Sequence, residues 1–377
     1  MANIVEHLYV HVPFCAVKCH YCAFYSEAGS AAQMSAYVEA LLAECDHRLA
    51  WLSARGYRLE PRTVFFGGGT PSLLPAHLWD RLLTGLRHRV ALHEVVEWTI
   101  ECNPATLTTE KLRLWRDAGV TRLSLGVQAL SDDALEQLGR IHTVAQARAS
   151  YDKARAAGFE NVNLDLMFGL PGQTLDGWMQ TLTEAIHWQP DHVSAYALTL
   201  EEDTEFWRRY AAPDAAPCDL PDAAQQAEMY KRAIELLTAA GFEHYEISNF
   251  ARAGRVCRHN LAYWEGRDYL GLGPSACSTI GDRRWQIAPD LNAYLAHKGK
   301  PPVAMEETLT PALRAAERLA FGMRLTAGVP AAWLRGRWEQ TAQRLVADGL
   351  ARWEGDRLRP TERGILFADL VGAEFVS

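Results

Sequence analysis

The sequence lacks the features of membrane, secreted and nucleic-acid-binding proteins. No apolar run approaches the roughly 18 residues that a membrane-spanning helix needs, and the first residues carry no basic stretch that would open a secretory signal. Positive charge is also scarce, because 38 Lys and Arg face 46 Asp and Glu, a net charge of −8. A surface that binds a phosphate backbone needs the opposite balance. We therefore expect a cytoplasmic protein without a nucleic-acid partner.

The composition also excludes disorder and a disulfide framework. Hydrophobic residues make up 49% and charged residues 22% of the 377 residues, values typical of globular domains. The chain has 8 cysteines, and thiols in the cytosol stay reduced unless they bind metal or take part in chemistry. The spacing of the cysteines is therefore more informative than their number.

Short apolar segments alternate with longer amphipathic segments through the first half of the chain. This order predicts an α/β fold whose parallel sheet curls into a whole or partial (β/α)6 barrel over residues 1–211. The predicted strands are His7–Val12, Thr63–Phe66, Val95–Glu101, Arg122–Gly126, Asn161–Met167 and His192–Leu198. The predicted helices are Gln33–Ala54, Pro75–Val90, Thr109–Ala118, Thr143–Ala157 and Leu175–Trp188, and Gly119 and Gly158 are expected to close two of them.

Two further regions follow the predicted barrel. A connecting region, 212–302, contains a helix over Asp222–Ala240 and a strand over Glu243–Ser248, and it ends at a Gly-Lys-Pro-Pro sequence. Residues 303–377 predict a small helical domain that resembles a winged helix, with a hairpin around Gly355 and a last helix over Thr361–Leu370. Residues 301–377 carry ten arginines and ten acidic residues, so we expect this domain to pack or to dock a partner rather than to bind DNA.

Three cysteines, Cys15, Cys19 and Cys22, stand within eight residues directly after the first predicted strand. Three thiolates so close together can hold three irons of a [4Fe–4S] cube and leave the fourth iron open. A zinc site closed by His20 or by a distant cysteine is the alternative, as is a group of buried thiols. The position at a strand end favours a functional site, because parallel barrels carry their chemistry at that mouth.

The spacing Cys-x3-Cys-x2-Cys, followed by the aromatic Phe24, resembles the radical S-adenosylmethionine (SAM) superfamily. The run from Tyr9 to Cys15 resembles the oxygen-independent coproporphyrinogen oxidase branch, and within it the haem chaperones. The resemblance implies a [4Fe–4S] cluster on the three cysteines, SAM at the open iron and an electron donor. It also leaves a homodimer and a peripheral membrane association open.

The resemblance further implies which residues bind SAM. In that superfamily the turn at Gly67–Pro71, here with Gly68, Gly69 and Thr70, cradles the methionine end of SAM. A glycine turn alone would be equally typical of a plain tight turn. The other residues assigned to SAM in this way are Glu101, Asp165, Gln128, Arg140 and Tyr9.

A second motif, His259-Asn260-x-x-Tyr263-Trp264, is linked to haem binding in the resembling branch. An imidazole is a common axial ligand of haem iron, and aromatic rings offer flat walls to a porphyrin. A histidine beside aromatic residues is otherwise more often a core residue. Where relatives of this branch usually have a histidine, this chain has Cys277, so the role of that position stays open.

The resemblance leaves two main hypotheses for the function. In the first, the protein is a haem chaperone that binds haem and passes it to acceptor haemoproteins such as respiratory enzymes. In the second, it is a radical SAM tetrapyrrole enzyme such as a coproporphyrinogen decarboxylase. Phe24 stands where those oxidases carry a further cysteine, and only fourteen residues precede Cys15. Both features favour the chaperone, and we assign no catalytic residue.

Overall fold

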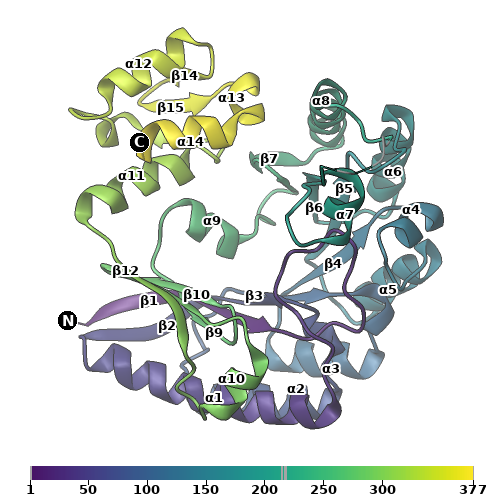
Figure 1. Cartoon of the computed structure of the whole chain (residues 1–377), viewed down its shortest axis with the longest axis vertical. Helices are drawn as coiled ribbons and strands as arrows, with labels where there is room; N and C mark the ends of the chain where they lie inside the picture. The colour runs from purple at the N-terminus through teal and green to yellow at the C-terminus, as the bar shows by residue number, and fades with distance from the viewer. Residues whose placement is uncertain (1, 214, 216–218, 377) are drawn as a thin grey trace.

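An open nine-stranded sheet forms the centre of the computed structural model, which describes residues 2–213, 215 and 219–376 (Figure 1). The strand order is β7-β8-β6-β5-β4-β3-β2-β1-β9, and β1 to β6 run parallel. The parallel strands are β1 (Asn3–Val12), β2 (Tyr57–Gly68), β3 (Glu97–Cys102), β4 (Arg122–Gln128), β5 (Val162–Phe168) and β6 (His192–Ala197). All six predicted strands are therefore confirmed, and the sheet curves into a partial barrel.

Helices cover the outer face of this sheet (Figure 1). They are α1 (Ala31–Ser53), α2 (Ala76–Arg87), α3 (Thr109–Ala118), α4 (Asp132–Gln137), α5 (Val144–Ala156) and α6 (Leu175–His187). Side-chain caps fix where several of them begin: Ser30 and Gln33 form a capping box on α1, as Thr143 and Gln146 do on α5. Gly119 closes α3 with a φ of 91°, and Gly158 follows α5 with a φ of 85°, which confirms the left-handed conformation expected at both positions.

The two faces of the barrel strands differ in polarity. In β4, Leu123, Leu125 and Val127 are fully buried in the hydrophobic core against the helices. Successive side chains of a strand point to opposite faces, so Arg122, Ser124, Gly126 and Gln128 turn to the barrel interior. The same alternation in the other strands gives the barrel a polar inside, which reaches the surface at the carboxyl ends of the strands.

The connecting region adds strands to both edges of the sheet. Strand β8 lies antiparallel beside β6 with β7 outside it, whereas β9 lies parallel beside β1. Strands β10, β11 and β12 form a separate antiparallel sheet. The elements from the end of β6 to β12 are α7 (Glu205–Tyr210), α8 (Ala223–Ala239), β7 (Glu243–Glu246), β8 (Asn249–Ala251), α9 (Arg258–Trp264), β9 (Leu270–Leu272), β10 (Cys277–Ile280), β11 (Arg283–Ile287), α10 (Leu291–Ala296) and β12 (Val303–Thr308); α7 and β12 lie just outside the predicted connecting region.

The C-terminal residues have a hydrophobic core of their own, which includes Leu319, Leu358 and Phe375. Their elements are α11 (Pro311–Gly322), β13 (Val329–Pro330), a short 3-10 helix (Ala331–Trp333), α12 (Glu339–Ala347), β14 (Ala351–Glu354), β15 (Arg357–Pro360), α13 (Glu362–Leu366) and α14 (Ala368–Val376). The hairpin around Gly355 is confirmed. The single last helix was wrong, because the chain leaves the helical conformation at Phe367 and α14 packs against α11. None of the helices in the described ranges has the length and apolar character needed to cross a membrane.

Candidate functional site

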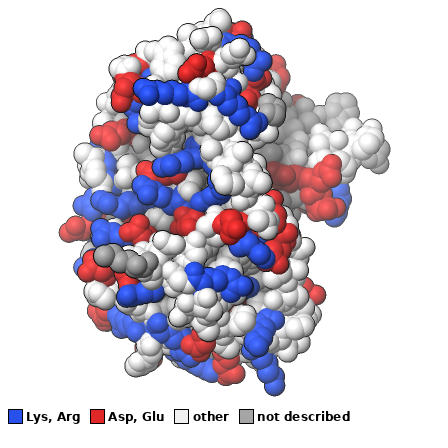
Figure 2. Space-filling view, turned by 90° about the vertical axis from the view of Figure 1, so that its left-hand side faces the viewer, with Lys and Arg blue, Asp and Glu red and all other residues white. Residues whose placement is uncertain are grey.

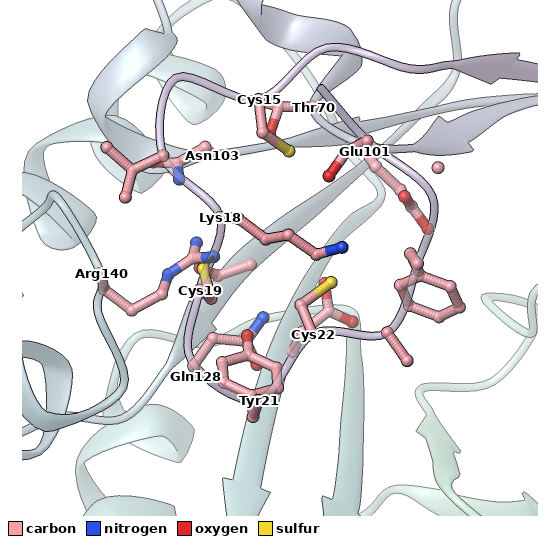
Figure 3. Close-up of a pocket in the computed structure, with 18 of the residues that line it drawn as sticks. Cys15, Lys18, Cys19, Tyr21, Cys22, Thr70, Glu101, Asn103, Gln128 and Arg140 are labelled. Atoms are coloured by element: carbon pink, nitrogen blue, oxygen red, sulfur yellow. Dashed lines mark hydrogen bonds between the residues drawn. The ribbon is translucent and has the colours of Figure 1, made fainter. Parts of the chain in front are cut away.

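A pocket of about 480 Å³ lies at the carboxyl ends of the barrel strands (Figure 3). The loop after β1, the turn after β2 and the ends of β3 to β6 all contribute to its lining. It therefore occupies the mouth at which parallel barrels hold ligands. The predicted residues that line it are Cys15, Cys19, Cys22, Gly68, Gly69, Thr70, Glu101, Gln128, Arg140 and Asp165.

The three cysteines of the β1 loop are free thiols that surround one side of this pocket (Figure 3). Each is partly exposed, and Sγ of Cys15 lies 3.3 Å from the hydroxyl of Thr70. Burial raises the pKa of the Cys22 thiol, and the nearby Cys19 and Cys15 raise it further, which shows that the thiols lie within electrostatic reach of one another.

The arrangement of the thiols fits a cluster better than a single ion. Among the described residues, no three His, Cys, Asp or Glu side chains come close enough together to hold one metal ion. A closed structural zinc site needs four such ligands around one point. In a [4Fe–4S] cube each thiolate binds a different iron, so three thiols spread around one pocket suit that group. Figure 3 shows the Lys18 side chain extending between Cys15 and Cys22.

The glycine turn after β2 holds the cysteine loop in place. A Cβ on Gly69 would lie 2.8 Å from the carbonyl oxygen of Phe14 and 2.9 Å from that of Val12. The close approach allows two backbone bonds, from Gly69 N to the Val12 oxygen at 2.9 Å and from Thr70 N to the Phe14 oxygen at 2.7 Å. Gly68 has a φ of 101°, a conformation that glycine adopts without strain. The glycines therefore let the backbone approach the cysteine loop.

Two part-buried carboxyl groups face the pocket, Glu101 near the end of β3 and Asp165 in the middle of β5. Burial raises the pKa of Glu101 to about 8, and the charge of Asp165 adds to that shift. Burial also raises the pKa of Asp165, although Ser124 and Asn163 donate hydrogen bonds to it at 3.1 and 2.7 Å. A ligand that brings a positive charge and hydroxyl or amino donors would stabilise both carboxylates. SAM, a sulfonium with an amino group and ribose hydroxyls, meets that requirement.

Gln128 and Arg140 lie at the same mouth. Gln128 adopts a φ of 70°, unusual for a residue other than glycine, and its side-chain oxygen accepts a hydrogen bond from Tyr196 at 2.6 Å. The Arg140 guanidinium donates to Sγ of Cys19 at 3.3 Å and to the Gly126 carbonyl at 2.6 Å. This guanidinium therefore fixes one cysteine and leaves further donors for an anionic group in the pocket.

Tyr9 does not line the main pocket. It borders an adjacent cavity of about 270 Å³, together with Phe24, Tyr263 and Cys277. Its hydroxyl lies 3.2 Å from Nδ1 of His11. The side chain thus stands behind the cysteine loop, and the cavity that it borders connects this loop with the region of the haem-linked motif, His259-Asn260-x-x-Tyr263-Trp264.

The haem-linked motif forms helix α9, which Glu97 anchors against the barrel. The Glu97 carboxylate accepts the backbone N–H groups of Arg258 and His259 at 2.8 and 3.0 Å. His259 is buried, with Nδ1 2.7 Å from the Thr63 hydroxyl and Nε2 3.0 Å from the Tyr263 hydroxyl. Ligation of iron by His259 would require one of these bonds to break.

Several pocket residues were missed by the sequence analysis. Tyr21, Asn103 and Tyr196 line the pocket, and Lys18 lies between the cysteines in sequence and in space. Asn103 directly follows β3 and Tyr196 stands at the end of β6, so the rule that strand ends carry function could have found both. No comparable signal marks Tyr21, which reaches the pocket through the path of the cysteine loop.

The family model of the radical SAM superfamily matches residues 9–185. That match, the partial barrel and the cysteine-lined pocket place the chain in the radical SAM superfamily. A [4Fe–4S] cluster and SAM are accordingly its cofactors.

The relatives narrow the family further. The chain is 38% identical to the heme chaperone HemW of Mycobacterium tuberculosis (strain ATCC 25618 / H37Rv), over 97% of this chain and 93% of that protein. It is 37% identical to HemW of Bacillus subtilis (strain 168), over 85% and 84%. The chain belongs to the HemW family. Coproporphyrinogen III oxidase (HemN) from Escherichia coli has a similar structure, with a TM-score of 0.82 and 25% identity over 100% of this chain and 90% of that one.

Proposed function

We propose that this chain is a haem chaperone that binds haem and passes it to acceptor haemoproteins. The observation that carries the proposal is the similarity to proteins named as HemW over 97% of this chain and 93% of the relative. The intact His-Asn-x-x-Tyr-Trp motif on α9 supports it. The cluster and SAM would then regulate haem binding, and respiratory haem enzymes would be among the acceptors.

In this proposal the main pocket holds the cluster and SAM. Cys15, Cys19 and Cys22 bind the cluster, which when bound supplies a redox centre with one iron open to SAM. The backbone of Gly68, Gly69 and Thr70 lies beside the methionine end of SAM. The polar residues that bind and orient SAM in the pocket are Glu101, Asp165, Gln128 and Arg140. Tyr9 lies behind them.

The haem-linked motif serves haem through Tyr263 and Trp264. Both side chains line a cavity of about 320 Å³ outside the barrel, whereas His259 stands behind Tyr263 with its ring against Phe65. We propose that His259 belongs to the haem site by fixing Tyr263. Cys277 lies in the cavity beyond Tyr263 and Tyr269 and offers a thiol to the same region.

The second hypothesis, an oxidative decarboxylase of coproporphyrinogen, has the structural likeness to HemN in its favour. Against it stands Phe24, which occupies the position of the further cysteine of those oxidases. Phe24 is 69% exposed and lines the pocket, where a thiol would face the cluster loop. The greater sequence identity to HemW than to HemN, 38% against 25%, also favours the chaperone.

The proposed organisation assigns one role to each region. Residues 1–211 hold the cluster and SAM, residues 212–302 hold the haem-linked motif, and residues 303–377 form the winged-helix-like domain. A dedicated electron donor, a homodimer and a peripheral membrane association stay predictions from the resemblance.

One pair of assays tests the proposal. Haem is titrated into the anaerobically reconstituted chain and transfer to an apo-haemoprotein is followed by its Soret band; we expect saturable binding and transfer. Coproporphyrinogen III is then incubated with the same material, SAM and a reductant, and we expect it to return unchanged. Conversion to protoporphyrinogen at an enzymatic rate would contradict the chaperone hypothesis and support the decarboxylase hypothesis.

A further inference from the structure

The cavity lined by Tyr263 and Trp264 lies outside the barrel, where α9, the β10–β11 hairpin and α11 meet. Its volume is about 320 Å³. Tyr263 and Trp264 of the haem-linked motif form one wall, and Tyr269 and Phe321 form the others. The ring centres of Tyr263 and Tyr269 are 4.6 Å apart and the rings meet at 83°, the edge-to-face contact that aromatic pairs favour. Such walls suit a flat, largely apolar ligand.

Three arginines line the same cavity: Arg267, Arg284 and Arg314. Arg284 is committed to the protein, because it forms a two-pronged ion pair with Glu317 at 2.6 and 2.8 Å and also binds Glu307. Its charge is therefore neutralised, and its role is to fasten α11 to β11. The other two arginines, Arg267 and Arg314, use only some of their N–H groups in hydrogen bonds to the protein.

Arg314 and Arg267 keep donors free for a ligand. Arg314 donates through Nη2 to Asp268 at 2.7 Å and to the Gly266 carbonyl at 3.3 Å. Arg267 donates through Nε to Glu265 at 3.0 Å, in a pair that lies at the surface and contributes little stability. A guanidinium has five N–H donors, so the outer nitrogens of Arg267 remain available in the described structure.

A fourth arginine, Arg318, stands one helical turn after Arg314 and packs against Gly266 at the rim of the cavity. Among the described residues it forms no ion pair; its guanidinium lies 3.9 Å from the ring centre of Trp333. Burial lowers the pKa of Arg318, and the positive charges of Arg267 and Arg314 lower it further. These arginines are thus close enough to repel one another.

Four arginines and four carboxylates stand beside the cavity, so their formal charges balance, but the ion pairs are unevenly distributed. Glu265 and Asp268 oppose Arg267 and Arg314, whereas Glu307 and Glu317 are both paired with Arg284. Arg318 is the arginine of this group that forms no ion pair among the described residues, although Glu265 lies within its electrostatic reach. Figure 2 shows the face of the molecule that carries α11 and β12 in Figure 1, where lysines and arginines are interspersed with Asp and Glu. An anionic ligand would relieve the repulsion of Arg318 by Arg267 and Arg314.

On the basis of the proposed function, we propose that this cavity holds the carboxylate-bearing edge of haem, with its propionates paired to Arg267, Arg314 and Arg318. Haem combines a flat apolar ring with two carboxylates on one edge, as the cavity combines aromatic walls with guanidinium groups on one rim. Guanidinium and carboxylate form two parallel hydrogen bonds, so the pairing also orients the ring. This site adds to the haem-linked motif a set of charged residues that lie outside it.

The test compares ferric haem with its dimethyl ester, in which both carboxylates are blocked. Each is titrated into the cofactor-loaded full chain and into the double variant Arg267→Gln/Arg318→Gln, and the dissociation constant is taken from the Soret band. The variant should bind haem about tenfold more weakly or worse. It should bind the ester as tightly as the unmodified chain does.

The double variant Arg352→Gln/Arg363→Gln serves as the control, because it removes the same charge from exposed residues of the C-terminal domain. It should leave the affinity for haem unchanged. Equal loss of haem and ester in the Arg267/Arg318 variant would show a structural role and overturn the assignment. Unchanged haem binding in that variant would also overturn it, while the proposed function would stand. Failure of the unmodified chain to bind haem would instead overturn the proposed function itself.

Discussion

Nε2 of His192, on strand β6 inside the barrel, lies 2.8 Å from the hydroxyl of Tyr245 on β7. Burial holds the pKa of His192 well below its ordinary value, so the ring is neutral and the tyrosine donates to Nε2. The same hydroxyl accepts the backbone N–H of Cys257 at 3.2 Å, directly before α9. Nδ1 of His192 continues the chain to Asn163 at 2.6 Å, and Asn163 donates to Asp165. A continuous set of hydrogen bonds therefore joins the SAM pocket to the haem-linked helix.

Removing the hydroxyl in Tyr245→Phe should destabilise the protein. The change leaves a buried imidazole nitrogen and a backbone N–H without partners, and such groups cost about 1–3 kcal/mol. We expect the free energy of unfolding of the cofactor-free chain, measured in urea, to fall by about 2 kcal/mol. Tyr57→Phe is the control, because the Tyr57 hydroxyl has no hydrogen bond within the described part of the chain. A Tyr245→Phe protein as stable as this control would contradict the role of the hydroxyl.

The cluster prediction concerns Cys15, Cys19 and Cys22. Anaerobic reconstitution should give about four irons per chain with the brown absorbance of a [4Fe–4S] cluster, and the triple change to Ala should abolish both. Cys45→Ala, at a fully buried cysteine of the helical layer, should retain the iron. Iron analysis and visible spectra report the result. Brown colour in the triple variant would mean that other residues bind the cluster.

The close approach of the glycine turn to the cysteine loop predicts a second effect on the iron content of the chain. Gly69→Ala places a methyl group against the carbonyl oxygens of Phe14 and Val12, at 2.8 and 2.9 Å. The cysteine loop must then move, so we expect the iron content after reconstitution to fall to less than half while the far-ultraviolet circular dichroism stays unchanged. Gly372→Ala, where the nearest atom would be 3.5 Å away, should bind iron normally. Full iron loading of Gly69→Ala would show that the loop accommodates the methyl group.

The carboxyl group of Glu101 predicts how stability depends on pH. Its pKa is raised to about 8 in the folded chain by burial and by Asp165, whereas the unfolded chain has an ordinary value near 4.3. Between these values the folded state binds the extra proton, so the free energy of unfolding of the cofactor-free chain should decrease as pH rises from about 5 to 8. Denaturation in urea at several pH values measures this slope.

Glu101→Gln should reduce that slope, because an amide does not titrate. The exposed Glu202→Gln provides the matched control and should keep the slope of the unmodified chain. An unchanged slope in Glu101→Gln would assign the pH dependence to another buried group, such as Glu246, whose pKa burial raises to about 7.

His259 and Tyr263 give a prediction about haem. His259 shares a hydrogen bond with the Tyr263 hydroxyl, and its ring is buried behind Tyr263. Because His259→Ala and Tyr263→Phe both remove this bond, they should weaken haem binding by similar factors. The Soret position of the bound haem should stay the same in both variants. A shifted Soret band in His259→Ala alone would identify the histidine as an axial ligand of the iron.

The sequence was sufficient to predict the six barrel strands, because each is an apolar β-rich segment followed by a turn. The three cysteines and the resemblance to the radical SAM superfamily together led to ten residues that line the pocket, from Cys15 to Asp165. The sequence could not show that His259 is enclosed between Thr63 and Tyr263, because Thr63 is 196 residues away in the sequence. Nor could it reveal the arginines around the cavity of Tyr263 and Trp264, which come from separate elements, or the break at Phe367, after which α14 packs against α11.

Strand β9 of the connecting region lies directly beside β1, whose carboxyl end leads into Cys15. The segment that contains the haem-linked helix therefore pairs with the strand that precedes the cysteines. At the other side of the barrel, β8 of the same segment pairs with β6. A gene fragment that stops after β6 would leave both borders of the sheet bare and prone to self-association. The cluster and SAM region and the haem-linked region consequently have to be encoded, expressed and folded as one chain.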